Sequence, residues 1–196
     1  ITESEKAGHI TYFFNGFQEK PFLNEYRVVI PSVQTLEPEK QPAMMASQIT
    51  QRVLVSLKEG SFDFILINYP NVDTIAHTGN FGAVIKAIQA LDQEVLRLLQ
   101  AITDQNHILI ITSDHGNAEE LFNIETGQTQ SNHTENPVPF YLVANEFQRK
   151  KFSAPAAEKN LPQIGILADV APTILKLMQI PKPEEMTGDN LLNQLI

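Results

Sequence analysis

The chain has 196 residues, of which 42% are hydrophobic and 19% are charged, and its formal net charge is −9. This composition is typical of a globular protein with a hydrophobic core, and the acidic balance argues against nucleic acid or an anionic membrane as a partner. No hydrophobic run approaches the roughly 20 residues that a membrane span needs. The absence of cysteine excludes disulfides, thiolate metal sites and a cysteine nucleophile, and it fits a cytoplasmic protein.

The first part of the chain is predicted to hold strands and one helix. Aromatic and β-branched residues predict strands at 9–14 and 27–30. A nearly continuous hydrophobic run predicts a further strand at 62–69, covered on both faces. Between the strands at 27–30 and 62–69, hydrophobic residues at every fourth position predict a helix over 42–58, which Gly60 ends.

The second part continues the alternation of helices and strands. A broad hydrophobic stripe predicts a long helix over 80–103, and hydrophobic runs predict strands at 107–112 and 137–143. A second helix is predicted over 166–179, with Pro172 in its first turns. A polar loop is expected over about 145–163 and a short final helix from Asp189. This order predicts an α/β fold around a mostly parallel sheet, as one domain over 1–196.

Candidate metal ligands follow the predicted strands. Asp73 and His77 come after the strand at 62–69 and, four residues apart, share a face if they lie on one helical turn. Asp114 and His115 directly follow the strand at 107–112, and His133 precedes the next strand. Ligands of open α/β sheets bind beyond the carboxyl ends of the strands, so these loops are expected to share one end of the sheet.

Each of these pieces also has a plain structural interpretation. Asp, Gly and Asn after a strand are common turn residues, and His133 alone reads as an ordinary loop histidine. Taken together, however, two aspartates and three histidines match what a pair of divalent ions requires, and such sites handle phosphoryl groups. With no cysteine in the chain, oxygen and imidazole ligands suit Mn, Mg, Zn or Fe.

The order of these motifs resembles the alkaline phosphatase superfamily and, within it, the cofactor-independent phosphoglycerate mutases. The resemblance covers essentially the whole chain. It rests on Glu3-Ser-Glu-Lys6, His9-Ile-Thr-Tyr-Phe-Phe-Asn-Gly16, Ile30-Pro-Ser32, Asp73-x-x-x-His77, Asp114-His-Gly-Asn-Ala-Glu119, His133-Thr-Glu-Asn-Pro-Val-Pro139, Leu167-Ala-Asp-Val-Ala-Pro-Thr-Ile-Leu175, Glu185-Met-Thr-Gly188 and Leu191-Leu192.

This resemblance implies a three-layer α/β/α sandwich, incomplete in this chain, and a two-metal site. Asp73, His77 and His133 are expected to hold one ion, and Asp114 and His115 the other. Mn is the expected metal, with Mg, Zn and Co as alternatives, and no 2,3-bisphosphoglycerate is required. The resemblance points Lys6 at the phosphoryl group or at a serine nucleophile, although position alone favours a solvated lysine near a terminus.

The implied reaction interconverts 3-phosphoglycerate and 2-phosphoglycerate through a phosphoserine intermediate. An aspartate ligand, the serine and the substrate-holding arginines of the family have no counterpart here, so the chain is expected to be the C-terminal part of such an enzyme and inactive alone. We expect the full-length enzyme to be a monomer, whereas this fragment self-associates through an exposed sheet edge and exposed hydrophobic surface. Two alternatives are another phosphomutase or phosphodiesterase of the superfamily, and a non-catalytic metal-binding module.

The sequence also departs from the family pattern. Phe17 stands where the family usually has a second glycine after Gly16. Asn71-Val-Asp-Thr-Ile-Ala-His77 keeps the two ligands within an altered segment, and Thr35-Leu-Glu37 replaces an expected Thr-Tyr-Asp. These changes leave every candidate ligand in place and are expected to affect local backbone and substrate fit.

Overall fold

The computed structural model describes residues 1–123, 126–147 and 163–195. These residues form two compact units. The first unit comprises residues 1–105 and 116–135, and the second comprises residues 106–115 and 136–196. Among the helices of the described segments, none is both long enough and hydrophobic enough to cross a membrane.

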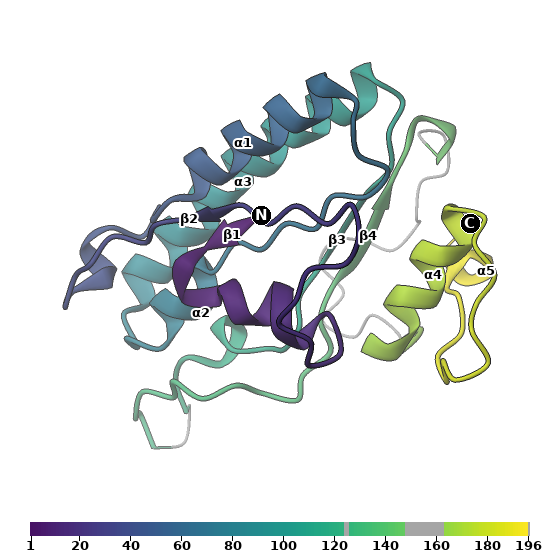
Figure 1. Cartoon of the computed structure of the whole chain (residues 1–196). Helices are drawn as coiled ribbons and strands as arrows, with labels where there is room; N and C mark the ends of the chain where they lie inside the picture. Colours follow the sequence, from purple (N-terminus) through teal and green to yellow (C-terminus); the bar gives the residue numbers. More distant parts are fainter. Residues whose placement is uncertain (124–125, 148–162, 196) are drawn as a thin grey trace. The chain divides into compact units, whose positions relative to one another are not determined.

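The first unit is mainly helical, with one small parallel sheet. Strand β1 pairs with β2 through Thr2 opposite Val29 and Glu3 opposite Ile30. Helices α1 and α3 lie side by side, and α2 packs against α3 (Figure 1). The elements of this unit are β1 (Thr2–Glu3), β2 (Val29–Ile30), α1 (Ala46–Glu59), α2 (Asn71–Ala76) and α3 (Phe81–Asp104), with 3-10 turns at Ser4–Lys6, Pro38–Lys40 and Ala118–Glu120.

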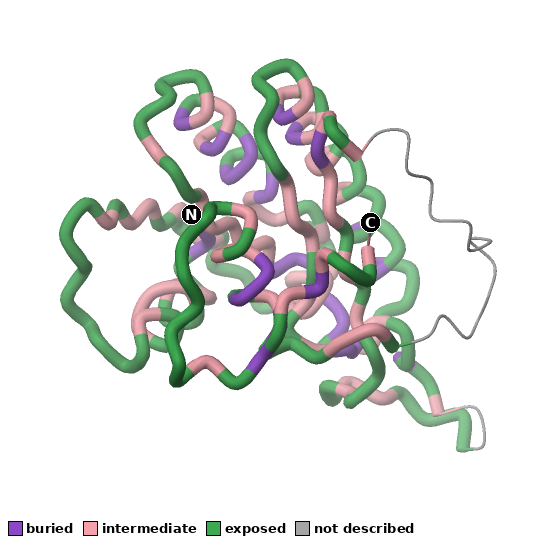
Figure 2. The backbone as a smooth tube through the Cα atoms, turned by 90° about the vertical axis from the view of Figure 1, so that its right-hand side faces the viewer, coloured by how far each residue is buried: buried purple, intermediate pink, exposed green. Residues whose placement is uncertain are grey.

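The core of the first unit lies between α2, α3 and the segment after Gly116. Buried positions alternate with exposed ones along the helices (Figure 2), as expected for helices with one hydrophobic face. Helix α3 confirms the helix predicted over 80–103, and it begins where the Asn80 side chain accepts a hydrogen bond from the Ala83 amide at 3.0 Å. The core cluster consists of Ile75, Ala76, Ala83, Val84, Ala87 and Leu121.

Helix α1 starts later than the predicted 42–58. Residues 42–45 form turns instead, because the carbonyls of Pro42 and Ala43 accept hydrogen bonds from the Asn71 side chain at 3.1 and 2.7 Å. Met44 has a φ of 42°, which is incompatible with a regular helix. The predicted end is confirmed, since Gly60 closes the helix in the left-handed conformation with a φ of 64°.

The strand predicted at 9–14 is wrong. Residues His9–Phe13 form a π-helix. Directly after it, the Phe17 amide donates a hydrogen bond to the Tyr12 carbonyl, five residues earlier, at 2.8 Å. Aromatic rings four or five residues apart pack on one another here, with Phe13 in edge contact with Phe17 at 5.8 Å between ring centres. This spacing brings rings together on a helical turn, whereas in a strand they alternate between faces.

The strand predicted at 62–69 does not form a ladder in the structure. Its residues are half-buried, apart from the exposed Asp63 and Phe64, rather than covered on both faces. Part of it nevertheless runs beside the start of the chain. The Ile1 nitrogen donates to the Leu66 carbonyl at 2.8 Å, and the Asn68 amide donates to the Ile1 carbonyl at 3.0 Å. The segment is therefore tied next to β1 and leads directly into α2.

The second unit holds an antiparallel strand pair and two helices. Strands β3 (Leu109–Thr112) and β4 (Phe140–Val143) confirm the strands predicted at 107–112 and 137–143. They pair from Leu109 opposite Val143 to Thr112 opposite Phe140. Of the loop predicted over 145–163, residues 148–162 lie outside the described residues. The remaining elements are the 3-10 turns Asn145–Phe147 and Leu167–Asp169, α4 (Val170–Leu177) and α5 (Leu192–Leu195).

Two motifs of the second unit have structural roles. The Asp169 carboxylate accepts hydrogen bonds from the backbone amides of Ile166 and Asp189, both at 2.8 Å, and so joins the start of α4 to the turn before α5. Gly188 lies so close to the backbone of Ala168 that a Cβ atom has no room there. The helix predicted over 166–179 is confirmed in its central part, with Pro172 in the first turn of α4.

Candidate metal centre

Helix α2 places two of the predicted ligands on one face. Asp73 lies in its first turn and His77 at its C-terminal cap, so that one helical turn separates them. The His77 Nε2 atom is 3.1 Å from the Asp73 Oδ1 atom. The helix is fixed by Ile75 and Ala76, which are fully buried in the core. The predicted pairing of Asp73 and His77 is therefore present in the structure.

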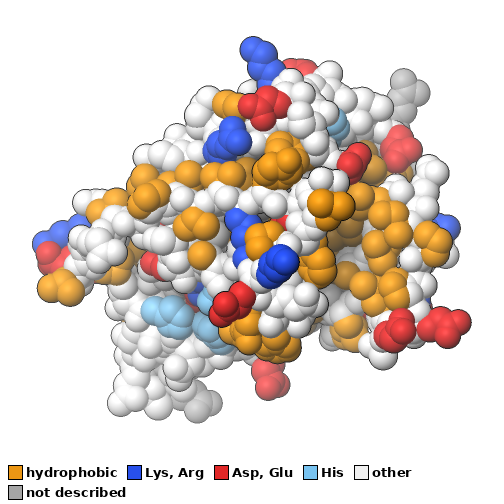
Figure 3. Space-filling view, in the orientation of Figure 1, with side chains coloured by type: hydrophobic (Ala, Val, Ile, Leu, Met, Phe, Trp, Pro, Cys, Tyr) orange, Lys and Arg blue, Asp and Glu red, His pale blue; other side chains and the backbone are white. Residues whose placement is uncertain are grey.

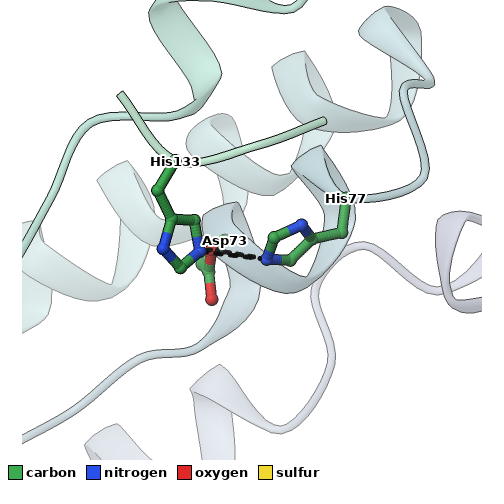
Figure 4. Close-up of side chains that lie close together, drawn as sticks. All are labelled: Asp73, His77 and His133. Atoms are coloured by element: carbon green, nitrogen blue, oxygen red, sulfur yellow. Dashed lines mark hydrogen bonds and ion pairs between the residues drawn. The ribbon is translucent and has the colours of Figure 1, made fainter. Parts of the chain in front are cut away.

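His133 reaches the same point from a loop far along the chain. Its Nε2 atom is 3.2 Å from Asp73 Oδ1 and 3.1 Å from His77 Nε2. Figure 4 shows the two imidazole rings and the carboxylate converging. Figure 3 shows a group of histidine side chains at the surface. His77 and His133 are each 46% exposed. Within the described residues, Asp73, His77 and His133 form the one group of three that could hold a metal ion; we call it the three-donor cluster.

Hydrogen bonding prepares His77 to act as a ligand. Its Nδ1 atom lies 2.7 Å from the Ser131 carbonyl oxygen. A carbonyl can only accept, so Nδ1 carries the proton and Nε2 is left as the basic nitrogen that faces Asp73 and His133. A carbonyl partner on the outer nitrogen is the usual arrangement of histidines that bind metals.

The spacing of the three donor atoms fits one small divalent ion. Donor atoms around a tetrahedral or octahedral ion with bonds of about 2.1 Å lie about 3.0 to 3.4 Å apart. The three separations in the cluster are 3.1, 3.1 and 3.2 Å. Two nitrogens and one carboxylate oxygen are also a chemically suitable donor set for Mn, Zn or Co.

Lys6 lies at the same site. Its Nζ atom donates to Asp73 Oδ2 at 2.7 Å, and both side chains are largely buried, with 19% and 17% of their surface exposed. Burial alone raises the pKa of Asp73, but the hydrogen bond and charge of Lys6 and the hydrogen bond from Asn117 outweigh it and lower the pKa below its ordinary value. Asp73 is thus held as a carboxylate, the form that binds a cation.

Asp114 and His115 belong to the second unit, directly after β3. The Asp114 Oδ1 atom lies 3.6 Å from His115 Nε2. Asp114 is 71% exposed and His115 is 21% exposed. The Ser113 hydroxyl donates to the His115 carbonyl at 2.8 Å and closes the turn. The pair contributes two donor groups, and its role as a metal site stays a prediction.

Two residues next to the cluster had no role assigned from the sequence. The Asn117 side chain donates through Nδ2 to Asp73 Oδ1 at 3.2 Å. Glu119 accepts hydrogen bonds from the Asn117 backbone amide at 2.8 Å and from the Thr134 hydroxyl. Both residues stand in the motif Asp114-His-Gly-Asn-Ala-Glu119, directly after the predicted ligand pair, and this proximity was the only signal that could have indicated them.

A family model described as the metalloenzyme superfamily matches residues 1–182. The chain belongs to the metalloenzyme superfamily. Metalloenzymes that it resembles include the 2,3-bisphosphoglycerate-independent phosphoglycerate mutases of Clostridium botulinum, with 41% identity over 98% of the chain, and of Cyanothece, with 42% identity over 100% of the chain. The corresponding enzyme of Ehrlichia ruminantium has 44% identity over 98% of the chain. The chain spans 36% of the length of each of these relatives.

A solved structure gives the same relationship. A phosphoglycerate mutase of Leishmania mexicana, described at low cobalt concentration, matches with a TM-score of 0.80 and 28% sequence identity. The match covers 95% of this chain and 35% of the other. It confirms the predicted α/β class and the incomplete, alkaline-phosphatase-like domain of this metalloenzyme.

Proposed function

We propose that the protein carrying this chain is a 2,3-bisphosphoglycerate-independent phosphoglycerate mutase. It interconverts 3-phosphoglycerate and 2-phosphoglycerate and requires no 2,3-bisphosphoglycerate. The observation that carries the proposal is the three-donor cluster with Lys6 on its carboxylate, in a chain 41% identical to an enzyme of that name over 98% of its length. Such a site supports phosphoryl transfer better than a non-catalytic role, because it combines metal donors with a cation suited to phosphate.

The residues of the cluster have distinct roles in this proposal. Asp73, His77 and His133 hold one divalent ion, for which we propose Mn, with Mg, Zn and Co as alternatives. The bound ions supply a lowered pKa for the attacking hydroxyl and neutralise charge on the transferring oxygens. Lys6 orients the phosphoryl group and adds positive charge beside it, and Asp73 keeps the ammonium group in place until substrate binds.

Asp114 and His115 contribute to a second ion in the same proposal. Their two donor groups are too few for a closed site, which fits a site that takes further ligands from other parts of the protein. The resemblance assigns these ligands to an aspartate and to the serine that becomes phosphorylated. In this arrangement the serine receives the phosphoryl group and returns it to the other hydroxyl of the glycerate.

The remaining features of the protein agree with this assignment. A phosphoglycerate is a small anion, and the formal charge of −9 is no obstacle because bound divalent ions reverse the local field. We propose a cytoplasmic, monomeric full-length enzyme with no nucleic acid or membrane partner. Residues 1–196 form the C-terminal portion of its metal-binding phosphatase domain.

The test is isomerase activity of the full-length protein. We expect it to convert 3-phosphoglycerate to 2-phosphoglycerate in the presence of Mn²⁺, at a rate that added 2,3-bisphosphoglycerate does not change. Chelation should abolish turnover, and returning Mn²⁺ should restore it. Release of free phosphate from phosphodiesters without isomerisation supports the alternative of another enzyme of the superfamily, and metal binding without any turnover supports a non-catalytic module.

A further inference from the structure

The carboxylate of Asp73 is held from both sides. Lys6 binds its Oδ2 atom, and Asn117 donates to Oδ1, the oxygen that faces both imidazoles. An ionised carboxylate only accepts hydrogen bonds, so the amide nitrogen of Asn117, and not its oxygen, must face Asp73. Asn117 therefore determines the direction in which Asp73 presents Oδ1.

The Asn117 side chain is buried, and its one side-chain hydrogen bond among the described residues is the contact with Asp73. It is 5% exposed, and its Oδ1 atom has no hydrogen-bond partner among the described residues. Burying an unsatisfied amide oxygen is unfavourable, so a structural role alone does not explain an asparagine at this position. The Nδ2 contact with Asp73 does explain it.

Glu119 extends this arrangement to the loop that carries His133. Its carboxylate bridges the Asn117 backbone amide and the Thr134 hydroxyl, and the Thr134 amide donates to the Gly116 carbonyl at 2.8 Å. Thr134 follows His133 directly in the chain. One carboxylate thus joins the segment that orients Asp73 to the segment that delivers His133.

We propose that Asn117 and Glu119 are positioning residues, which hold Asp73 and the His133 loop in the arrangement that binds metal. The proposal rests on the proposed metal-binding role of the three-donor cluster. Neither residue needs to touch the ion. Without them the donor atoms remain present, but the carboxylate and the loop rotate away from one another, and part of the binding energy is then used to restore their positions.

The experiment is Mn²⁺ titration by calorimetry on the protein and on its Asn117→Ala, Asn117→Ser and Glu119→Gln variants. Loss of a hydrogen-bond partner of a metal ligand typically lowers affinity by about 10- to 100-fold, and we expect this for both Asn117 variants. Glu119→Gln should give a smaller loss, because Glu119 acts on Asp73 and His133 indirectly, through Asn117 and Thr134. The serine variant keeps a small polar side chain too short to reach Asp73, and it serves if the alanine variant fails to fold. Asn193→Ala and Glu146→Gln make the same chemical changes at exposed positions of the second unit and should leave affinity unchanged.

A second readout separates positioning from general stability. The melting temperature without metal should change far less than the metal affinity, because a folded but misaligned cluster loses affinity only. Folded variants that bind Mn²⁺ as tightly as the wild type overturn the positioning role while leaving the proposed function intact. A wild-type protein that binds no divalent ion overturns both.

Discussion

The three-donor cluster and the Asp114–His115 pair use the same kinds of side chain but are built differently. The cluster joins α2 to a loop 56 residues later in the chain, and its donor atoms lie within 3.2 Å of one another. The pair consists of neighbouring residues at the end of β3, with Asp114 71% exposed and its carboxylate 3.6 Å from the imidazole. The first is a convergent set of three candidate donors, and the second offers two candidate donors.

This difference shows what closeness in sequence can and cannot provide. Adjacent residues meet without any tertiary structure, but their side chains diverge unless something else orients them. Two of the donors of the cluster are oriented by hydrogen bonds, His77 by the Ser131 carbonyl and Asp73 by the Asn117 side chain. Preorganisation of this kind is what raises metal affinity, since less ordering remains to be done on binding.

The largest effect is expected when the Asp73 carboxylate is removed, and removing the Asp114 carboxylate in a separate variant provides the comparison. We expect Asp73→Ala to lower the Mn²⁺ affinity of the cluster by more than about 100-fold, because loss of a ligand exceeds the loss caused by removing a ligand's hydrogen-bond partner. Asp114→Ala should leave that site unchanged. Calorimetric titration of both variants makes the comparison, and equal losses of affinity contradict the distinction between the two regions.

Asp114→Ala also provides its own check on folding. Because this side chain is 71% exposed, the substitution should change the free energy of unfolding by no more than about 0.5 kcal/mol. A larger loss in thermal unfolding indicates that Asp114 supports the fold of the second unit, and its effect on metal binding then needs another variant.

The next effect tests the close packing beside the cluster. A Cβ atom at Gly116 meets the Thr134 hydroxyl and the Glu119 carboxylate, so Gly116→Ala should destabilise the protein by about 1 to 3 kcal/mol. It should also weaken metal binding, because the same two groups hold the His133 loop. Thermal unfolding and Mn²⁺ titration measure the two consequences.

Gly82→Ala is the matched control for that substitution. Gly82 lies in the first turn of α3, and an added Cβ atom meets only the Asn80 side chain at an ordinary 3.6 Å. Alanine in a helix should stabilise by about 0.5 to 1 kcal/mol relative to glycine. If both variants lose stability equally, the tight contact at Gly116 is not the cause.

A smaller effect of opposite sign is expected at Lys6. Lys6→Met removes a positive charge from the Asp73 carboxylate, and we expect metal affinity to rise about 3- to 10-fold, equivalent to roughly 1 kcal/mol of charge repulsion. Turnover in the proposed reaction should fall, because the phosphoryl group loses its cation. Lys20→Met changes an exposed lysine and should alter neither metal affinity nor turnover. A drop in metal affinity for Lys6→Met contradicts the prediction and shows that Lys6 supports the cluster.

The smallest effect lies outside both regions, at Phe17. This residue has a φ of 67°, a left-handed conformation that costs a non-glycine residue about 1 to 2 kcal/mol. Phe17→Gly relieves this cost but also removes the edge contacts of the Phe17 ring with Tyr12 and Phe13, so the free energy of unfolding should change by no more than about 0.5 kcal/mol. Phe14→Gly, at a helical φ of −62°, should destabilise the protein by about 0.5 to 1 kcal/mol; thermal unfolding compares the two.

The same substitution tests the predicted self-association of the 196-residue chain. The exposed hydrophobic side chains of the segment around Phe17 include Phe13, Phe14, Phe17, Leu23 and Tyr26. Sedimentation at increasing concentration should show association that Phe17→Gly reduces. A monomer at all concentrations contradicts the predicted association.

The sequence by itself determined the α/β class, the long helix α3, the strands β3 and β4, and every donor of the three-donor cluster. These follow from strong local patterns, such as a continuous hydrophobic stripe or a carboxylate and an imidazole four residues apart, which constrain the chain whatever surrounds it. The ordered motifs of a known family added the candidate role of Lys6 and the grouping of distant ligands, which spacing alone left open.

Only the tertiary structure decided how those pieces are held. The aromatic run at 9–14 carries strand-forming residues, yet ring packing at helical spacing made it a π-helix. The start of α1 was set by the Asn71 side chain from another helix. Asn117 and Glu119 have no role assigned from the sequence, because their hydrogen bonds to Asp73 and to Thr134 join residues far apart in the chain and leave no local pattern from which to infer them.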